Sequence, residues 1–259
     1  MKIQFIGVGS QFSNRDQYHS NMVITARSGK KMLIDCGGDV RFALEDSGIR
    51  VTELNAVYIS HLHADHVGGM EWLALITYFG RGDSRLKLFG EENLLSKLWI
   101  NSLKGGLECI GGKCLQLEDY FDCCPLVEAG PFYWESITGK MVKMPHVTGS
   151  LCQHFSYGLI LETTGAPKKV VFISSDTVFQ PEILEHISAT ADVIFHDCET
   201  TSMKTTVHAH YEQLRTLPAP TKQKIWLYHY QPDSGYDPLK DGFQGFVAKG
   251  QEFSFLETD

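Results

Sequence analysis

Short hydrophobic runs alternate with longer amphipathic segments along most of the chain. A short apolar run bounded by glycine or polar residues is typical of a buried strand, whereas apolar residues spaced by three and four positions indicate a helix. This pattern predicts strands at residues 3–9, 21–26, 31–35, 56–60, 86–89, 132–136, 140–144, 157–162, 169–173, 192–197 and 225–228. It predicts helices at residues 40–47, 69–79, 91–104 and 181–190, and one more that opens at residues 207–211.

The order of these elements predicts an α/β (α+β) fold. Strand meanders come first in each half of the chain, and strands then alternate with helices. Two sheets packed face to face, with helices on both outer faces, satisfy this order as an αββα sandwich. Hydrophobic strands such as 170–173 and 192–195 are as expected for a sheet that is covered on both faces.

Residues 105–131 carry glycine, cysteine and acidic residues without a clear period. We interpret them as an excursion from the sheets that could cover the mouth of a site. Cys109, Cys114, Cys123 and Cys124 cluster there, but no C-x-x-C pair occurs, so buried and inert thiols are favoured over a small metal site. No linker or repeat divides the chain, which predicts a single domain over residues 1–259.

The densest group of chemically active residues is the stretch His61-Leu62-His63-Ala64-Asp65-His66. It follows a predicted strand and precedes a predicted helix, and α/β folds place their chemistry at such turns. Imidazole nitrogens and carboxylate oxygens are the ligands that Zn²⁺ and similar divalent ions prefer. His61 and His63 project from one side of an extended segment and can reach one ion. Asp65 and His66 can reach a second ion.

Two other carboxylates lie at the ends of predicted strands. Asp176 follows the buried strand 169–173, and no helix begins close enough for it to act as a cap, which favours a role as ligand. Asp35 ends strand 31–35 and is either a turn carboxylate or a partner that orients a ligating histidine. Asp39 is predicted to cap the helix at 40–47.

The H-x-H-x-D-H motif at His61–His66 resembles the metallo-β-lactamase superfamily of metal-dependent hydrolases. That family adds a further histidine, a bridging aspartate and a final histidine later in the chain. The resemblance implies an αββα sandwich of the metallo-β-lactamase type and two divalent ions, with zinc preferred and manganese or iron as alternatives. It implies that one ion takes His61, His63 and His146, that the other takes Asp65, His66 and His229, and that Asp176 bridges them together with a water.

The third histidine of the first ion has two candidates in this sequence. His146 emerges from a predicted strand, as this fold presents its ligand, whereas His154 is predicted to lie in the loop beyond it. Neither has the family's spacing to the following Gly158. We choose His146 and keep His154 as a pocket residue. At the bridging aspartate, Ser175 stands where the family usually has glycine.

The downstream segments resemble the ribonuclease Z-like branch of the superfamily. They are Phe195-His196-Asp197-Cys198-Glu199-Thr200 and Val207-His208-Ala209-His210. In that branch a histidine paired with an acidic residue donates a proton to the leaving alkoxide. The resemblance implies that His208 is this acid, with His210 as second choice and Asp197 or Glu199 as its partner. We predict that Asp65, His208 and His210 are the catalytic residues.

The predicted function is hydrolysis of a small phosphodiester, such as a cyclic nucleotide, by a hydroxide that bridges two metal ions. Ribonuclease Z proper carries a long basic arm before the bridging aspartate, but only 30 residues separate His146 from Asp176 here. A ribonuclease Z-type RNA endonuclease is therefore the less favoured reading. A thioester, lactone or ester hydrolase of the same fold would use the same metals, and a non-catalytic ligand-binding member is also compatible with the fold.

Composition limits the partners. The formal net charge of −8 argues against a nucleic-acid polymer and an anionic membrane, which leaves a small-molecule substrate. The first residues read as a strand, and no apolar run is long enough to span a bilayer. The seven cysteines and the lack of an export signal predict reduced thiols and a cytoplasmic location. A homodimer is compatible with all of this.

Overall fold

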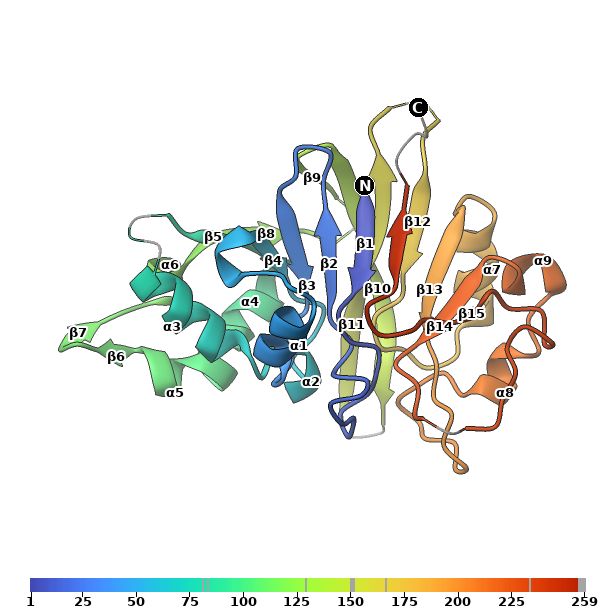
Figure 1. Ribbon diagram of the computed structural model, residues 1–259. Coiled ribbons are helices and arrows are strands. Elements are labelled where there is room, and N and C mark those ends of the chain that lie inside the picture. Colours follow the sequence, from blue (N-terminus) through green and yellow to red (C-terminus); the bar gives the residue numbers. More distant parts are fainter. Residues whose placement is uncertain are drawn as a thin grey trace.

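The computed structural model describes residues 1–80, 82, 84–128, 130–149, 152–165, 167–232 and 234–255. Two sheets lie face to face at its centre, with helices to either side of them (Figure 1). This arrangement confirms the predicted αββα sandwich. The first sheet has the spatial order β16 (Glu252–Ser254), β1 (Lys2–Phe5), β2 (Met22–Thr25), β3 (Lys31–Ile34), β4 (Leu54–Tyr58), β5 (Leu86–Glu91) and β8 (Phe121–Leu126).

The second sheet has the spatial order β15 (Gly245–Phe246), β14 (Ile225–Tyr228), β13 (Val193–Asp197), β12 (Val170–Ile173), β11 (Gln153–Thr163), β10 (Ile137–Thr148) and β9 (Pro131–Trp134). The strands β12, β13, β14 and β15 run parallel to one another, as do β3, β4, β5 and β8 in the first sheet. The carboxyl ends of parallel strands meet at one edge of a sheet, so loops that follow them lie close together.

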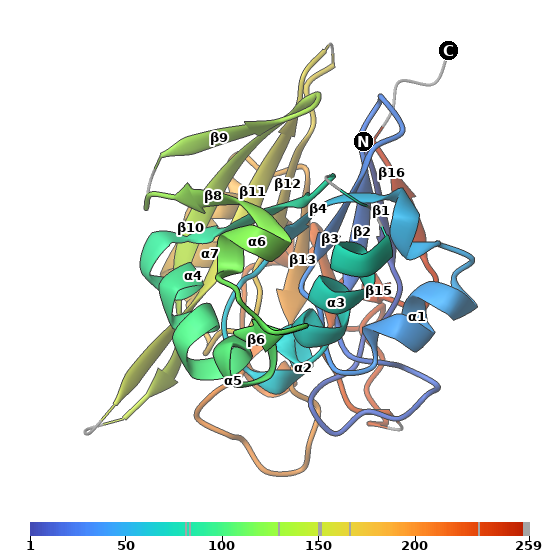
Figure 2. The ribbon, with the colours of Figure 1, turned by 90° about the vertical axis from the view of Figure 1, so that its left-hand side faces the viewer.

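The helices fall into two groups, one beside each sheet (Figures 1 and 2). Beside the first sheet are α1 (Val40–Asp46), the 3₁₀ turn η1 (Val51–Glu53), α2 (Ala64–Val67), α3 (Met70–Gly80), α4 (Glu92–Leu98), the π-helical turn η2 (Trp99–Leu103), α5 (Lys104–Leu107) and α6 (Leu117–Tyr120). Beside the second sheet are α7 (Pro181–Ser188), α8 (Tyr211–Leu214) and α9 (Ala219–Lys222). Among the described residues, none of these helices is long and apolar enough to cross a membrane.

Aromatic side chains join the two sheets at the centre of the core. The ring of Phe5 on β1 lies 4.9 Å from that of Phe195 on β13 and 5.6 Å from that of Tyr228 on β14, measured between centroids. All three side chains are buried. Burial of each such ring stabilises the fold by ~1.5–3 kcal/mol. The prediction that residues 1–259 form a single domain stays a prediction.

The segment 105–131 differs from its prediction. It adds β8 in parallel to β5 and so extends the first sheet, and the ribbon of β6 (Cys109–Ile110) and β7 (Lys113–Cys114) projects at the far left of Figure 1. The prediction of buried thiols is wrong for Cys109 and Cys114, which are exposed. Among the described residues, no cysteine belongs to a group that could hold a metal ion.

Asp39 also differs from its prediction. It stands at the cap position of α1, but its side chain makes no capping hydrogen bond there. Its carboxylate instead accepts a hydrogen bond from the backbone N–H of His19 at 3.0 Å. Asp39 therefore holds the loop that leads into β2 rather than the end of the helix.

Candidate metal centre

The candidate ligands lie in the segments that follow strands of both sheets. His61–His66 follows β4, Asp176 follows β12 and His229 follows β14. The turn that carries His61–His66 packs closely on the loop after β3, where an added Cβ at Gly37 would clash with the backbone oxygen of Asp65. Only glycine allows this approach, so Gly37 fixes how deeply the histidine turn sits in the molecule.

The structure brings all seven predicted ligands together. Among the described residues, three groups each present ligand atoms within 4.8 Å of one another and all contain Asp176; the third consists of Asp176, Asp197, His208 and His229. The first group is His61, His63, His146 and Asp176, and the second is Asp65, His66, Asp176 and His229. This is the division that the resemblance implies. Ligation of metal by these residues stays a prediction.

Asp176 lies at the centre of the cluster. Its Oδ2 is 3.2 Å from Nε2 of His66, 3.5 Å from Nε2 of His229 and 3.6 Å from Nε2 of His61. Asp176 is buried and comes from the end of β12, in the middle of the second sheet. One carboxylate can therefore serve both groups.

Hydrogen bonds on the outer ring nitrogens orient two of the histidines. Nδ1 of His66 donates to the carboxylate of Asp35 at 2.7 Å, and Nδ1 of His146 donates to the backbone oxygen of Val207 at 2.7 Å. A proton on Nδ1 leaves the lone pair of Nε2 directed into the cluster, the arrangement common to metal-binding histidines. Asp35 is thus the orienting partner, one of the two roles that its position after β3 allowed. The carbonyl of Val207 had no signal in the sequence, because it is a backbone group.

Ser60 extends the same arrangement to His61. Its hydroxyl donates to Asp35 at 2.8 Å and lies 3.1 Å from Nδ1 of His61, so it can accept the proton of that nitrogen. The backbone N–H of Ser60 also donates to Asp35 at 2.8 Å. One buried carboxylate therefore fixes two histidines of different groups.

The donor atoms fit divalent metal ions. Nε2 of His61, Nε2 of His66 and Oδ1 of Asp176 are buried, and none has a hydrogen-bond partner among the described residues. Buried polar atoms are rarely left unpaired, so this concentration calls for a cation. Burial lowers the pKa of His61 below its ordinary value and that of His146 to about 4. Both rings are then neutral at pH 7 and keep a lone pair for a metal.

The structure favours His146 over His154 as the third histidine of the first group. The β10–β11 pairing shifts register between Pro145 and Val147, so His146 sits at a β-bulge. Bulges re-aim side chains next to active sites, and here Nε2 of His146 lies 2.9 Å from Nδ1 of His63. The placement of His154 in a loop is wrong, because β11 begins at Gln153. His154 belongs to neither ligand group.

Substitution of these two histidines should separate their roles. His146→Ala should halve the metal content of the protein, because the first group loses one of its three nitrogen donors. His154→Ala should leave the metal content unchanged. Elemental analysis of both variants, purified without chelator, makes the comparison. The reverse pattern would show that His154 is the ligand.

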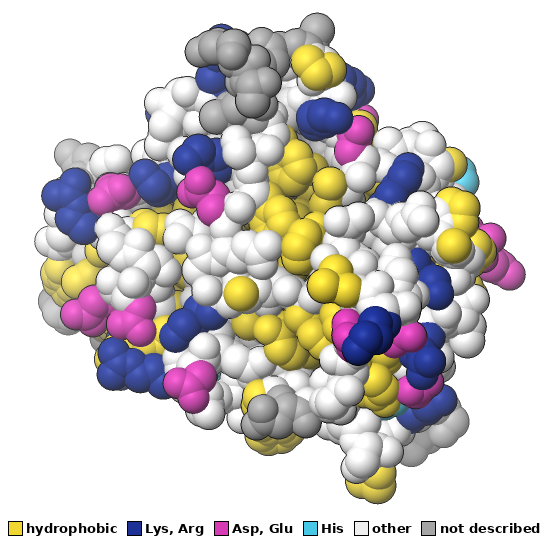
Figure 3. Space-filling model, turned by 45° about the vertical axis from the view of Figure 1, so that its right-hand side comes forward, with side chains coloured by type: hydrophobic (Ala, Val, Ile, Leu, Met, Phe, Trp, Pro, Cys, Tyr) yellow, Lys and Arg dark blue, Asp and Glu magenta, His cyan; other side chains and the backbone are white. Residues whose placement is uncertain are grey.

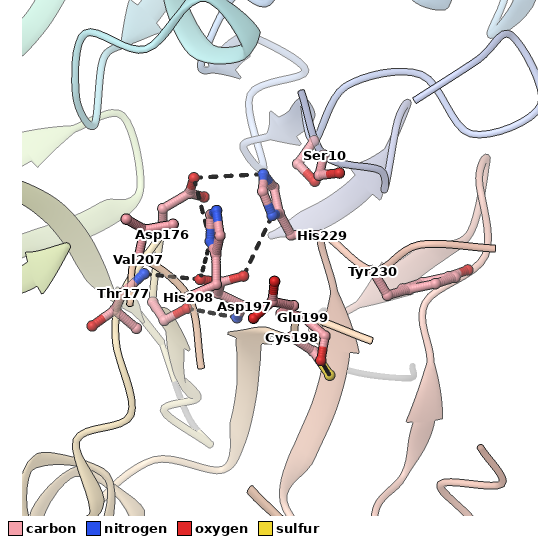
Figure 4. Close-up of polar contacts among 12 residues, drawn as sticks. Ser10, Asp176, Thr177, Asp197, Cys198, Glu199, Val207, His208, His229 and Tyr230 are labelled. Atoms are coloured by element: carbon pink, nitrogen blue, oxygen red, sulfur yellow. Dashed lines mark hydrogen bonds and ion pairs between the residues drawn. The ribbon is translucent and has the colours of Figure 1, made fainter. Parts of the chain in front are cut away.

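A further pair of side chains lies beside the second group (Figure 4). Nδ1 of His208 is 2.9 Å from Oδ2 of Asp197, whose other oxygen is 3.4 Å from Nδ1 of His229. Burial alone would raise the pKa of Asp197, but His208 and His229 together outweigh it and lower the pKa to about 2. For His208, burial lowers the pKa, but Asp197 and Asp176 together outweigh burial and raise the pKa above its ordinary value. His208 is thus built to carry a proton at the edge of the cluster.

His210 lies outside the cluster. Its Nε2 bonds to the backbone oxygen of Thr201 at 2.9 Å, and its Nδ1 accepts from the backbone N–H of Glu212 at 3.1 Å. Glu199 accepts bonds from Thr201 and Thr205, so Asp197 is the carboxylate that pairs with His208. Asp197 and Glu199 are two positions apart and would share one face of an extended segment, so the sequence pattern does not distinguish these two carboxylates.

Three non-glycine residues around the site adopt left-handed backbone conformations. They are Asp35 (φ 60°), Ser175 (φ 54°) and His229 (φ 64°). Such strain is kept only where the surrounding structure imposes it, and it gathers at functional sites. Ser175 stands where the superfamily usually has glycine, and its φ shows why glycine suits that position.

Comparisons with known proteins agree with this geometry. A family model described as Anti-Pycsar protein Apyc1 matches residues 1–253. An Anti-Pycsar protein Apyc1 from Paenibacillus xerothermodurans is 34% identical over 100% of this chain and 99% of its own length. Another, from Bacillus phage vB_BveM-Goe7, is 33% identical over 97% of each chain.

Solved structures agree on the fold. The metallo-β-lactamase fold protein YhfI from Bacillus subtilis has a TM-score of 0.74 at 18% identity and covers 97% of this chain and 98% of its own. Human tRNase Z, short form, has a TM-score of 0.71 at 16% identity, with coverage of 99% and 100%. These likenesses confirm the metallo-β-lactamase fold. The histidine and aspartate cluster offers ligand groups for divalent metal ions.

The functional prediction needs correction. It describes a hydrolase for a small phosphodiester and, less favoured, a thioester, lactone or ester hydrolase, a ribonuclease Z-type endonuclease or a non-catalytic member. The match to Anti-Pycsar protein Apyc1 overturns it, because none of these descriptions includes action against Pycsar. A cyclic nucleotide phosphodiesterase is compatible with the match to this family.

Proposed function

The chain belongs to the Anti-Pycsar protein Apyc1 family, and from this premise we propose that it acts against Pycsar as a metal-dependent phosphodiesterase that opens a cyclic nucleotide. One observation carries the proposal: two ligand groups share Asp176, and the pair of His208 and Asp197 lies beside them. Two adjacent cations suit a phosphodiester, whose two non-bridging oxygens share one negative charge. A neighbouring proton carrier suits the departure of an alkoxide.

Seven side chains would hold two divalent ions, zinc by preference because the donors are nitrogen and oxygen. His61, His63 and His146 would hold one ion, Asp65, His66 and His229 the other, and Asp176 both. Bound ions of this kind lower the pKa of water toward ~7 and neutralise charge on phosphate oxygens. The protein keeps the donors in place through Asp35, Ser60 and the carbonyl of Val207.

His208 would move the proton that the reaction needs at its leaving group. Asp197 accepts the bond from Nδ1 of His208 and so keeps the ring oriented, with Nε2 free of partners among the described residues. A proton delivered from Nε2 would neutralise the departing sugar oxygen as the P–O bond breaks. The side chain of His208 is 18% exposed, so solvent can return the proton.

Charge distribution supports a small substrate. On the face shown in Figure 3, Lys and Arg side chains are interspersed with Asp and Glu, and hydrophobic side chains run through its middle. A nucleic-acid polymer needs a continuous basic surface, because counterion release at many phosphates supplies most of its affinity. The net charge of −8 points the same way.

Direct assay tests this proposal. Protein reconstituted with Zn²⁺ or Mn²⁺ should convert 3′,5′-cyclic nucleotides to linear nucleoside monophosphates, and EDTA should remove the activity. Thioester, lactone and β-lactam probes serve as comparisons on the same preparation. Turnover of one of these probes without turnover of any cyclic nucleotide would overturn the proposal.

A further inference from the structure

A cavity of about 490 Å³ opens beside the candidate metal centre. The turn from His61 to His63 forms one side of it, and the end of β5 at Glu91, α4, η2 and the start of β11 supply the rest of its lining. Its volume lies within the ~300–1,000 Å³ typical of small-molecule sites. A phosphate group at the metal centre would leave most of this space to the rest of the substrate.

The strand wall of the cavity is aromatic. Gln153, Phe155 and Tyr157 alternate along β11, so their side chains leave the strand on one face, and all three line the cavity. The ammonium group of Lys143 lies 4.5 Å from the centroid of the Phe155 ring, which steadies that ring against the sheet. Aromatic rings in such positions stack with nucleobases.

The wall formed by β11 and the wall formed by α4 and η2 approach each other where α4 begins, at its cap residue Glu91. Burial and the neighbouring negative charge of Glu91 raise the pKa of the Tyr157 hydroxyl to about 12, so this group stays protonated beside the carboxylate. The carboxylate of Glu91 accepts from the backbone N–H of Leu94 at 2.8 Å and caps the helix. Glu91 therefore stabilises the wall of the cavity where α4 begins.

The helix wall carries polar groups that the fold does not use. Lys97 and Asn101 are four residues apart, so they share one face of the helical segment, and Asn101 lies within η2. Single π-helical turns inside helices occur frequently at functional sites. Among the described residues, the side chains of Lys97, Asn101 and Gln153 have no hydrogen-bond or ion-pair partner, although all three line the cavity.

We propose that this cavity binds the nucleobase of the cyclic nucleotide, with Asn101 and Gln153 hydrogen-bonding to the edge of the base. The inference rests on the proposed function and adds the part of the site that holds the substrate beyond its phosphate. An amide side chain offers both donors and an acceptor, which is what the edge of a nucleobase requires. Phe155 would support the face of the base, and Lys97 would donate to a base oxygen or ring nitrogen.

Kinetics of Asn101→Ala and Gln153→Ala test the inference on two substrates. With 3′,5′-cyclic nucleotides, each substitution should raise KM by ~2–10-fold, as expected for one lost hydrogen bond. The turnover number should stay within about twofold, because uniform binding affects KM alone. With bis-p-nitrophenyl phosphate, which has no base, both parameters should be unchanged. Ser96→Ala, an exposed position of α4 outside the cavity, is the matched control.

Two kinetic results would overturn the inference while the proposed function stands. One is an unchanged KM for cyclic nucleotides in both variants, and the other is an equal change with bis-p-nitrophenyl phosphate. If the wild-type protein hydrolyses no cyclic nucleotide, the proposed function fails. Equilibrium dialysis with cyclic nucleotides then tests whether the cavity binds the nucleobase. Weaker binding by both variants would support the nucleobase site, and wild-type affinity in both would overturn it.

Discussion

Asp176→Ala should lose both metal ions and lower phosphodiester turnover by more than about 100-fold. Substitution of a mere outer partner of a metal ligand typically costs ~10–100-fold, and Asp176 belongs to both ligand groups. Its Oδ2 lies 3.2–3.6 Å from ring nitrogens of His66, His229 and His61, so its removal leaves two dications without the charge that separates them. Elemental analysis and initial rates with a cyclic nucleotide measure the two effects.

The matched control is Asp122→Ala. Asp122 is an exposed carboxylate on β8, where it pairs with Lys87, and its loss should change neither metal content nor rate. An Asp176→Ala protein that keeps two ions and a tenth or more of the wild-type turnover would contradict the central position given to this residue.

His208→Ala should slow cleavage of a cyclic nucleotide by ~10²–10⁴-fold, the usual contribution of a positioned general acid. Cleavage of bis-p-nitrophenyl phosphate should fall far less, because p-nitrophenolate leaves readily without a proton. Metal content should stay at the wild-type level, because His208 is in neither of the two groups that contain the seven predicted ligands, and its Nδ1 pairs with Asp197. Parallel rate measurements with both substrates give the selectivity.

His210→Ala is the control for this experiment. Its ring bonds to backbone groups of Thr201 and Glu212, so its loss should affect both substrates equally or not at all. Equal losses on both substrates for His208→Ala would mean that His208 only positions the substrate. A selective loss in His210→Ala would move the acid to that residue.

The cluster of candidate ligands was predictable because its histidines and carboxylates are concentrated in local sequence. Residues His61–His66 lie between a clear strand and a clear helix. The close spacing of three histidines and an aspartate there has few explanations other than metal binding. Asp176 and His229 follow apolar strands whose ends had to meet at one edge of the sandwich. The fold class followed from the same strands, since hydrophobic periodicity records which faces are buried.

The parts that differed depend on tertiary contacts. The pattern predicts a loop at His154, but β10 and β11 pair beyond their hydrophobic segments, and backbone hydrogen bonding extends the strands through polar residues. β8 has no clear signal in the sequence because an edge strand needs little apolar sequence. Asp39 lies at the predicted cap position, but its carboxylate accepts a hydrogen bond from the backbone N–H of His19 instead. Only the folded chain brings His19 near Asp39.

The grouping of Lys97, Asn101 and Gln153 around one cavity could not be predicted from the sequence, for a related reason. Isolated polar residues on a helix and at the start of a strand look like any solvent-exposed positions. Their significance comes from sharing one cavity beside His61 and His63, and from lacking partners within the described part of the chain. A spacing rule cannot express such a juxtaposition between α4, η2 and β11.

Titration of metal-free protein with Zn²⁺, while cyclic nucleotide hydrolysis is followed, tests the two-ion site most directly. The seven donors form two groups around one shared carboxylate, so activity should rise until two equivalents per chain are bound and then level off. Full activity at one equivalent, with no second ion taken up at higher zinc, would contradict the account.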